Sequence, residues 1–78
     1  MKKVDVRVRF GRAVRRRREQ LQISQEELAH RAEMHRTYVG DIERGARNVS
    51  LINIERLARA LELKPSELFS KYGLENSD

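Results

Sequence analysis

Apolar residues recur at helical spacing along most of the chain. Phe10, Val14 and Leu21 lie on one face of a helix that is predicted to begin after Asp5, a candidate N-cap, and to end near Leu21. A run of alternate valines before Phe10 also fits a short strand. The helical spacing that follows outweighs that alternation, so the first element is predicted to be a helix.

A second helix has the strongest start signal in the sequence. In the string Ser-Gln-Glu-Glu at residues 24–27, the Ser24 hydroxyl can accept from the Glu27 amide while the Glu27 side chain reaches back, which is a capping box. The predicted inner face of this helix consists of Leu28, Ala29 and Ala32.

A third helix is predicted from about Arg36 to Arg44, with Val39 and Ile42 pointing inward. Gly45 can end it in a left-handed conformation. Two short helices joined by so tight a turn cross steeply and share one small core. The outer face of the third helix is then free to enter a DNA major groove, whose width admits a helix.

Two more helices complete the predicted fold. Ser50 is the N-cap of the fourth, and Pro65 suits the first position of the fifth, which ends near Gly73. One apolar stripe is expected along the fourth helix at Leu51, Ile54, Leu57, Ala58 and Leu61. The chain is therefore predicted to be a single all-α domain over residues 1–78, with a core at about 6–72 and a frayed C-terminal tail.

Positive charge is concentrated at one end of the chain. The net charge is +5, yet residues 1–18 hold nine basic residues and one acidic residue, a balance of +8. A basic segment of this kind fits a polyanion such as nucleic acid, and a solvated arginine-rich helix face is an equal reading. A membrane surface fits less well, because no broad aromatic or leucine face accompanies the charge.

Several classes of function lack their signals. There is no cysteine, no apolar run long enough for a bilayer and no signal peptide, so a cytoplasmic protein is expected. His30 and His35 are spaced poorly for a metal site. No nucleophile–base set or phosphate-cradling glycine loop is present, so we expect neither an enzyme nor a bound cofactor or small-molecule effector.

The segment from Ser24 to Gly45 resembles the lambda-repressor-like (Cro-type) helix-turn-helix family. The resemblance covers roughly Phe10 to Phe69. The strings at residues 35–38, 41–45 and 47–50 are most similar to the controller proteins of restriction–modification systems. The resemblance implies a compact five-helix domain with its helix-turn-helix in the second and third helices. It also implies a transcription regulator that binds double-stranded DNA in a sequence-specific manner.

The sequence departs from the family pattern at its turns. Glycine is common in the family where Gln22, Glu33 and Glu62 stand here. If those residues are left-handed, each costs on the order of 1 kcal/mol. His35 also replaces the serine or threonine that often caps the third helix.

The resemblance assigns base contacts to the start of the third helix. Arg36 fits guanine O6 and N7, and Thr37 fits a thymine methyl or a hydrogen-bonding edge. Asp41, one turn further along, either accepts from a cytosine amino group or excludes wrong sequences by repelling phosphate. Gly40 allows close approach to the groove. An ordinary exposed turn is the alternative for Arg36 and Thr37.

Phosphate contacts are implied around these residues, and they fix register without reading sequence. The set comprises Gln25, Tyr38, Arg47, Asn48 and Ser50. Tyr38 equally fits packing over the edge of the second helix. Arg18 and Glu43 occupy positions that form a partly buried ion pair in family members. Arg18 is therefore interpreted as a structural brace, while the neighbouring arginines either attract DNA or are solvated.

A homodimer is expected, because so short a chain has little room for a separate effector domain. It would bind a pseudo-palindrome with half-sites about 10 bp apart and regulate its own synthesis through its concentration. Apolar residues left over near the C-terminus suggest an interface at Leu63, Leu68, Phe69, Tyr72 and Leu74, although Leu68 and Phe69 equally fit the monomer core. RNA polymerase is a further candidate partner. The competing hypothesis is a protein-interaction or antitoxin-like module with the same fold.

Overall fold

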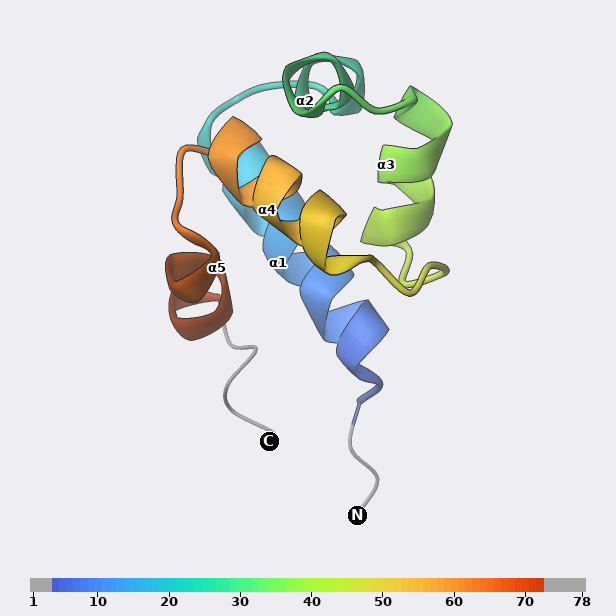
Figure 1. Cartoon of the computed structure of the whole chain (residues 1–78), viewed down its shortest axis with the longest axis vertical. Helices are drawn as coiled ribbons and strands as arrows, with labels where there is room; N and C mark the ends of the chain where they lie inside the picture. The colour runs from blue at the N-terminus through green and yellow to red at the C-terminus, as the bar shows by residue number, and fades with distance from the viewer. Residues whose placement is uncertain (1–3, 73–78) are drawn as a thin grey trace.

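Five helices make up most of residues 4–72, the part of the chain that the structure, a computed structural model, describes. They are α1 (Val6–Gln20), α2 (Gln25–Ala32), α3 (Arg36–Glu43), α4 (Leu51–Ala60) and α5 (Pro65–Lys71). The described part contains no strand, so the all-α prediction is confirmed and the strand reading of the early valines is wrong. Figure 1 shows α3 and α5 on opposite sides of α1, each in contact with it.

The predicted caps explain where three of these helices begin. Asp5 Oδ1 accepts from the Arg7 amide at 2.8 Å, Ser24 Oγ from the Glu27 amide at 2.9 Å, and Ser50 Oγ from the Asn53 amide at 3.2 Å. Only the first half of the expected capping box forms in α2. The Glu27 carboxylate accepts from Arg31 one turn further on instead of reaching back.

Helices α1 to α4 are each followed by a left-handed residue, as the departures from the glycine pattern suggested. Gln22, Glu33 and Glu62 have φ angles of 59°, 59° and 63°, and Gly45 has 77°. After each of them, the next amide returns to a carbonyl five residues back, for example Met34 N to Ala29 O at 2.8 Å. This closing bond satisfies a carbonyl that the helix end would leave without a partner. Three of these turns thus place a non-glycine residue in the left-handed backbone conformation, which strains that residue but would not strain glycine.

One hydrophobic core joins all five helices. Its members are Phe10, Ala13, Val14, Leu28, Ala29, Ala32, Val39, Ile42, Leu57, Ala58, Ala60, Leu61 and Leu68. The expected stripe along α4 is wrong at its start, because Leu51 is 82% exposed. Helical spacing places Leu51 in line with the buried residues of α4, but it cannot say whether another element covers the first turn.

The backbones of α1 and α3 touch directly at a glycine that the sequence analysis did not single out. A Cβ built on Gly11 would lie 2.3 Å from the Ile42 carbonyl oxygen and 2.7 Å from that of Glu43. Glycine is therefore required for this close approach. The contact presses the buried face of α3 against α1 and leaves the opposite face of α3 outward.

Candidate nucleic-acid interface

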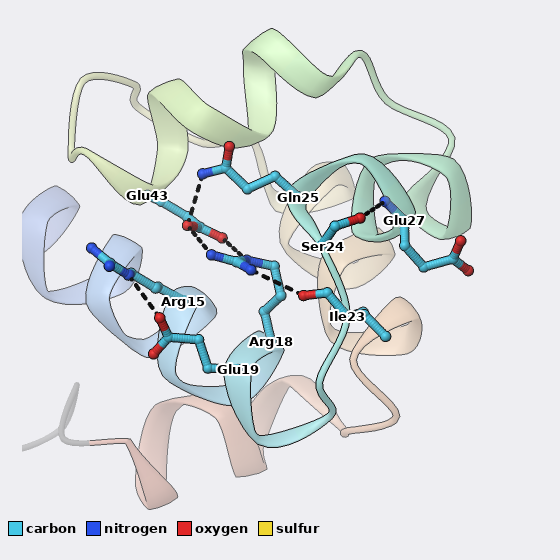
Figure 2. A network of polar contacts seen from close by, with 8 residues as sticks. All are labelled: Arg15, Arg18, Glu19, Ile23, Ser24, Gln25, Glu27 and Glu43. Carbon is cyan, nitrogen blue, oxygen red and sulfur yellow. Dashed lines mark hydrogen bonds and ion pairs between the residues drawn. The ribbon is translucent and has the colours of Figure 1, made fainter.

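A partly buried network, here called the brace, holds α3 on its inner side (Figure 2). Arg18 Nε donates to Glu43 Oε2 at 2.7 Å, Arg18 Nη2 to Glu43 Oε1 at 3.1 Å, and Arg18 Nη1 to the Ile23 carbonyl at 3.0 Å. Gln25 Nε2 adds a bond to Glu43 Oε1 at 3.0 Å. The bond to Glu43 raises the pKa of Arg18 above its ordinary value, so the guanidinium remains charged.

The brace ties together three separate elements. Arg18 comes from α1, Gln25 begins α2 and Glu43 ends α3, so the network holds the helix-turn-helix at a fixed angle to α1. Gln25, the expected phosphate contact, uses one side-chain N–H on Glu43. Its second N–H and the backbone amides of Gln25 and Glu26 remain for an anion, and a helix N-terminus favours one.

The start of α3 is the exposed end of the unit. Arg36 and Thr37 are both exposed, while Val39 and Ile42 on the same helix are buried. His35, at the N-cap, makes no side-chain capping bond, as its weak capping character led us to expect. Two side chains able to hydrogen-bond base edges therefore project from a helix end that is held rigidly from the other side.

Further along the outer face, three side chains form what we call the front triad: Asp41, Arg44 and Arg47. Arg44 Nη2 contacts Asp41 Oδ1, and Arg47 Nη2 lies 3.1 Å from Asp41 Oδ2. The Asp41 side chain is only 16% exposed, against 67% for Arg44 and 53% for Arg47. Asp41 is thus enclosed by two cations of its own chain and is not presented as an open acceptor.

The ring of Tyr38 packs against one member of the front triad, Arg47. The Arg47 guanidinium carbon lies 5.4 Å from the centre of the Tyr38 ring, a cation–π arrangement. The Tyr38 hydroxyl accepts from Asn53 Nδ2 at 3.2 Å. These partners belong to the loop after α3 and to α4, and the Tyr38 ring also packs against the hydrophobic core, to which α2 contributes. The hydroxyl proton remains able to donate to a phosphate.

Gly40 does not offer the open surface that was expected of it. The residue is buried, and a Cβ there would lie 3.4 Å from Arg44 Nη1 and 3.8 Å from Gln25 Oε1. Arg44 therefore covers Gly40, and the outer face at this level is presented by Arg44. The sequence held a signal for this, because residues 37, 41 and 44 recur at helical spacing.

The loop after α3 keeps its predicted residues outward. Arg47, Asn48 and Ser50 are exposed, and Ser50 also caps α4. Their position beside the outer face of α3 agrees with backbone contacts around a groove. The structure contains no nucleic acid, so the base and phosphate roles of all these residues stay predictions.

The arginines of α1 divide between different tasks, as helical geometry requires. Arg15 pairs with Glu19 at 3.1 Å, and Arg18 belongs to the brace. Arg17 Nε donates to the Leu61 carbonyl at 2.9 Å, at the C-terminal end of α4. This bond joins residues 44 positions apart, and no local pattern could have revealed it.

The interface expected near the C-terminus is largely occupied within the monomer. Leu68 is fully buried, so its assignment to a dimer interface is wrong. Phe69 packs against Phe10 with ring centres 6.2 Å apart, and the Tyr72 hydroxyl lies 2.6 Å from Gln20 Oε1. Leu63 is also packed against the core, and Leu74 lies outside the described residues.

A different apolar surface is open. Leu51 and Ile52 are 82% and 66% exposed at the start of α4. They line a shallow hollow with Ile54, Pro65 and Phe69, and we call these five residues the apolar face. A second hollow, lined by Val6, Phe10 and Val49 among others, shares Ile54 and Phe69 with it. Together the two hollows extend the apolar surface from α4 to the start of α1.

Comparison with known proteins supports what the geometry indicates. Residues 14–68 match the helix-turn-helix family. The chain belongs to this family. It is 49% identical to control protein C.BamHI of Bacillus amyloliquefaciens over 65 residues, which cover 82% of this chain and 80% of that protein. It is therefore a DNA-binding transcription regulator of the restriction–modification controller type, as the resemblance predicted.

Solved structures of controller proteins agree with this assignment. The controller protein C.AhdI of Aeromonas hydrophila is 51% identical and superposes with a TM-score of 0.79, covering 81% of this chain and 96% of that chain. A tetramer of controller protein C.Esp1396I, in complex with its natural 35-base-pair operator, is 25% identical with a TM-score of 0.84 and covers 92% and 95% of the two chains. The predicted five-helix fold is confirmed.

Other kinds of site find no support in the described residues. No helix among residues 4–72 is long and apolar enough to cross a membrane. Within the same part of the chain, no group of three acidic or histidine side chains could hold a metal ion. The outer face of α3 and the apolar face are therefore the two candidate binding surfaces of the described residues.

Proposed function

We propose that this protein is a cytoplasmic, autoregulating homodimer that reads a pseudo-palindromic operator through the exposed start of α3. The observation that carries the proposal is the contrast within α3: Arg36 and Thr37 project outward, while the brace and the core hold the rest of the helix. A side chain that reads a base edge must arrive in one orientation, and rigid support supplies it.

In this proposal, Arg36 donates to guanine and Thr37 contacts the neighbouring base. Gln25, Tyr38, Arg47, Asn48 and Ser50 surround them and hold the backbone. Each of these five has a donor group that can face a phosphate, and the first turn of α2 adds its amides. Arg44 joins the set because it covers Gly40 on the outer face.

The second copy of the chain docks on the apolar face. Leu51 and Ile52 are large, exposed and adjacent, and the hollow beside them continues to Phe69. An exposed apolar patch of this kind is typical of a protein–protein contact. The tetramer of C.Esp1396I on its operator supports assembly of several copies on DNA. Control of transcription also brings RNA polymerase near the bound dimer, as a candidate partner for activation.

A selection experiment tests the base-reading role. Purified protein is incubated with a random duplex library, and the retained DNA is sequenced. We expect enrichment of a two-fold symmetric site, and loss of that enrichment in the double variant Arg36→Ala, Thr37→Ala. Retention of DNA without any enriched sequence would contradict the proposal and would favour a protein-interaction module with a basic surface.

A second experiment tests the dimer surface. Leu51→Asp introduces a charge at a side chain that is 82% exposed, so the monomer should keep its fold. We expect a monomeric mass by light scattering and loss of cooperative binding to the symmetric site. Val4→Asp is the control, because it makes the same change at an exposed apolar residue outside the apolar face. A dimeric Leu51→Asp variant would place the interface elsewhere.

A further inference from the structure

The front triad puts an acidic residue where a DNA-binding surface needs positive charge. Asp41 accepts from both Arg44 and Arg47, and all three lie on the outer side of α3 or in the loop after it. Within the triad, one of the two positive charges is compensated. An acidic side chain at this position also repels a phosphate that approaches the arginines.

Both ion pairs are weak enough to open. The Asp41 side chain is only 16% exposed, but the two arginines are more than half exposed, so solvent screens both pairs and each contributes on the order of 1 kcal/mol. A well-placed phosphate or base can therefore compete with Asp41 for either guanidinium. In a non-specific encounter, the DNA phosphates are not aligned to displace Asp41 from both arginines at the same time.

We propose that Asp41 is a specificity residue that withholds Arg44 and Arg47 from indiscriminate contact with the DNA backbone. Asp41 itself reads no base. The arginines leave it only when Arg36 and Thr37 have seated α3 in the groove, because only then do both guanidinium groups meet partners at once. This inference rests on the proposed reading of DNA by α3, and it adds the means by which non-specific binding is kept low.

Two further contacts confine the arginines to this arrangement. Arg47 stacks on the Tyr38 ring, and Tyr38 is anchored to α4 through Asn53. Arg44 lies over Gly40, with Nη1 3.4 Å from the position that a Cβ of residue 40 would occupy. In the absence of DNA, each arginine thus contacts both Asp41 and one further residue of the protein, Gly40 for Arg44 and Tyr38 for Arg47.

The decisive variant is Asp41→Asn, which removes the charge and keeps the size of the side chain. Its matched control is Glu62→Gln, which makes the same charge change at the turn after α4. Glu62 pairs with Arg31 at 3.6 Å on the exposed surface, and glutamine already occupies the equivalent left-handed position at residue 22. Binding of each protein to its selected site and to a random duplex of equal length is measured across a salt series.

We expect Asp41→Asn to bind random duplex about tenfold more tightly than wild type. The slope of log affinity against log salt should steepen by about 1–2, because up to two more phosphates are contacted. Affinity for the selected site should change by less than about threefold, so the ratio of specific to non-specific binding falls. Adding Arg44→Gln to Asp41→Asn should reverse about half of the gain on random duplex.

Two results would overturn the inference. If Asp41→Asn weakens binding to both duplexes equally, Asp41 positions the arginines rather than withholding them. If its binding matches that of Glu62→Gln, the ion pairs have no role in recognition. A wild-type protein that selects no site would contradict the proposed function instead, and the comparison of the two variants on random duplex would still decide the role of Asp41.

Discussion

Helix α3 carries an arginine–carboxylate contact on each of its two sides, and the two contacts differ in burial. Behind the helix, the side chains of Glu43 and Arg18 are 4% and 13% exposed, and the Ile23 carbonyl and Gln25 complete their hydrogen bonds. In front, the Asp41 side chain is also largely covered, at 16% exposed, but the side chains of Arg44 and Arg47 that pair with it are 67% and 53% exposed. The carboxylates of both contacts, Asp41 and Glu43, belong to the same eight-residue helix.

The same pair of chemical groups therefore serves two purposes. In a buried pair both charged groups have lost their hydration, so removing one of them leaves the other without compensation and destabilises the fold. Such a pair therefore fixes the geometry of the elements that it joins. An exposed pair keeps most of its hydration and exchanges partners at low cost. Burial, rather than the identity of the side chains, separates a structural contact from one that can take part in recognition.

The largest effect is expected from breaking the brace. Glu43→Gln leaves the Arg18 charge buried without its counter-charge, which should lower the free energy of unfolding by about 3–5 kcal/mol. Urea denaturation measures the change. Glu19→Gln is the control, because it breaks an exposed pair with Arg15 and should cost less than about 0.5 kcal/mol. Equal losses in the two variants would remove the distinction between buried and exposed pairs.

The two glycines beside α3 sharpen the comparison. In Gly11→Ala, the new methyl group meets two backbone carbonyl oxygens at 2.3 and 2.7 Å, so α1 and α3 must separate. We expect a loss of about 2–3 kcal/mol in the free energy of unfolding. In Gly40→Ala, the nearest atom is the mobile end of Arg44 at 3.4 Å.

Gly40→Ala should therefore stabilise the fold by up to about 1 kcal/mol through helix propensity. Binding to DNA should change little, because the new methyl group meets Arg44 Nη1 at an ordinary contact distance of 3.4 Å. Thermal unfolding and binding to the selected duplex measure the two effects separately. A destabilised Gly40→Ala variant would show that the outer side of α3 is packed as tightly as the inner side.

A smaller effect is expected at the left-handed turn between α2 and α3. Glu33 has a φ of 59°, so Glu33→Gly should relieve strain and raise the free energy of unfolding by about 0.5–1 kcal/mol. Glu26→Gly, inside α2, should instead lower it by about 1 kcal/mol. Both are measured by thermal unfolding. If Glu33→Gly is no more stable than wild type, the left-handed backbone carries no strain.

The smallest expected effect is the loss of stability at low pH when Asp5, the N-cap of α1, is protonated. Hydrogen bonds from the side chain and backbone of Arg7 lower the pKa of Asp5 from 3.8 to about 2. Because the folded state has the lower pKa, the stabilisation is complete above pH 3.8 and is lost as the pH falls through about 2. The melting temperatures of wild type and Asp5→Asn should therefore converge over this interval. Curves that remain parallel would contradict the role of this charge.

Much of the fold could be predicted because its signals are local. The caps at Asp5, Ser24 and Ser50 act over two or three residues, and the left-handed turns follow directly after helix ends. The helical face of α3 likewise follows from spacing alone. The contacts of Arg36 and Thr37 with DNA remain predictions, because they depend on a partner that the fold does not contain.

Hydrogen bonds within one turn and apolar spacing are local, so they were enough to predict the five helices, where each begins, and the helix-turn-helix. The packing of the helices against one another was needed to show that Leu51 is exposed and Leu68 buried, and that Gly11 touches α3. It also decided that Arg17 binds the Leu61 carbonyl and that Asp41 is enclosed by two arginines. These outcomes depend on which helices pack against one another. That packing decides how far a side chain is exposed to solvent and which groups a charged side chain can contact.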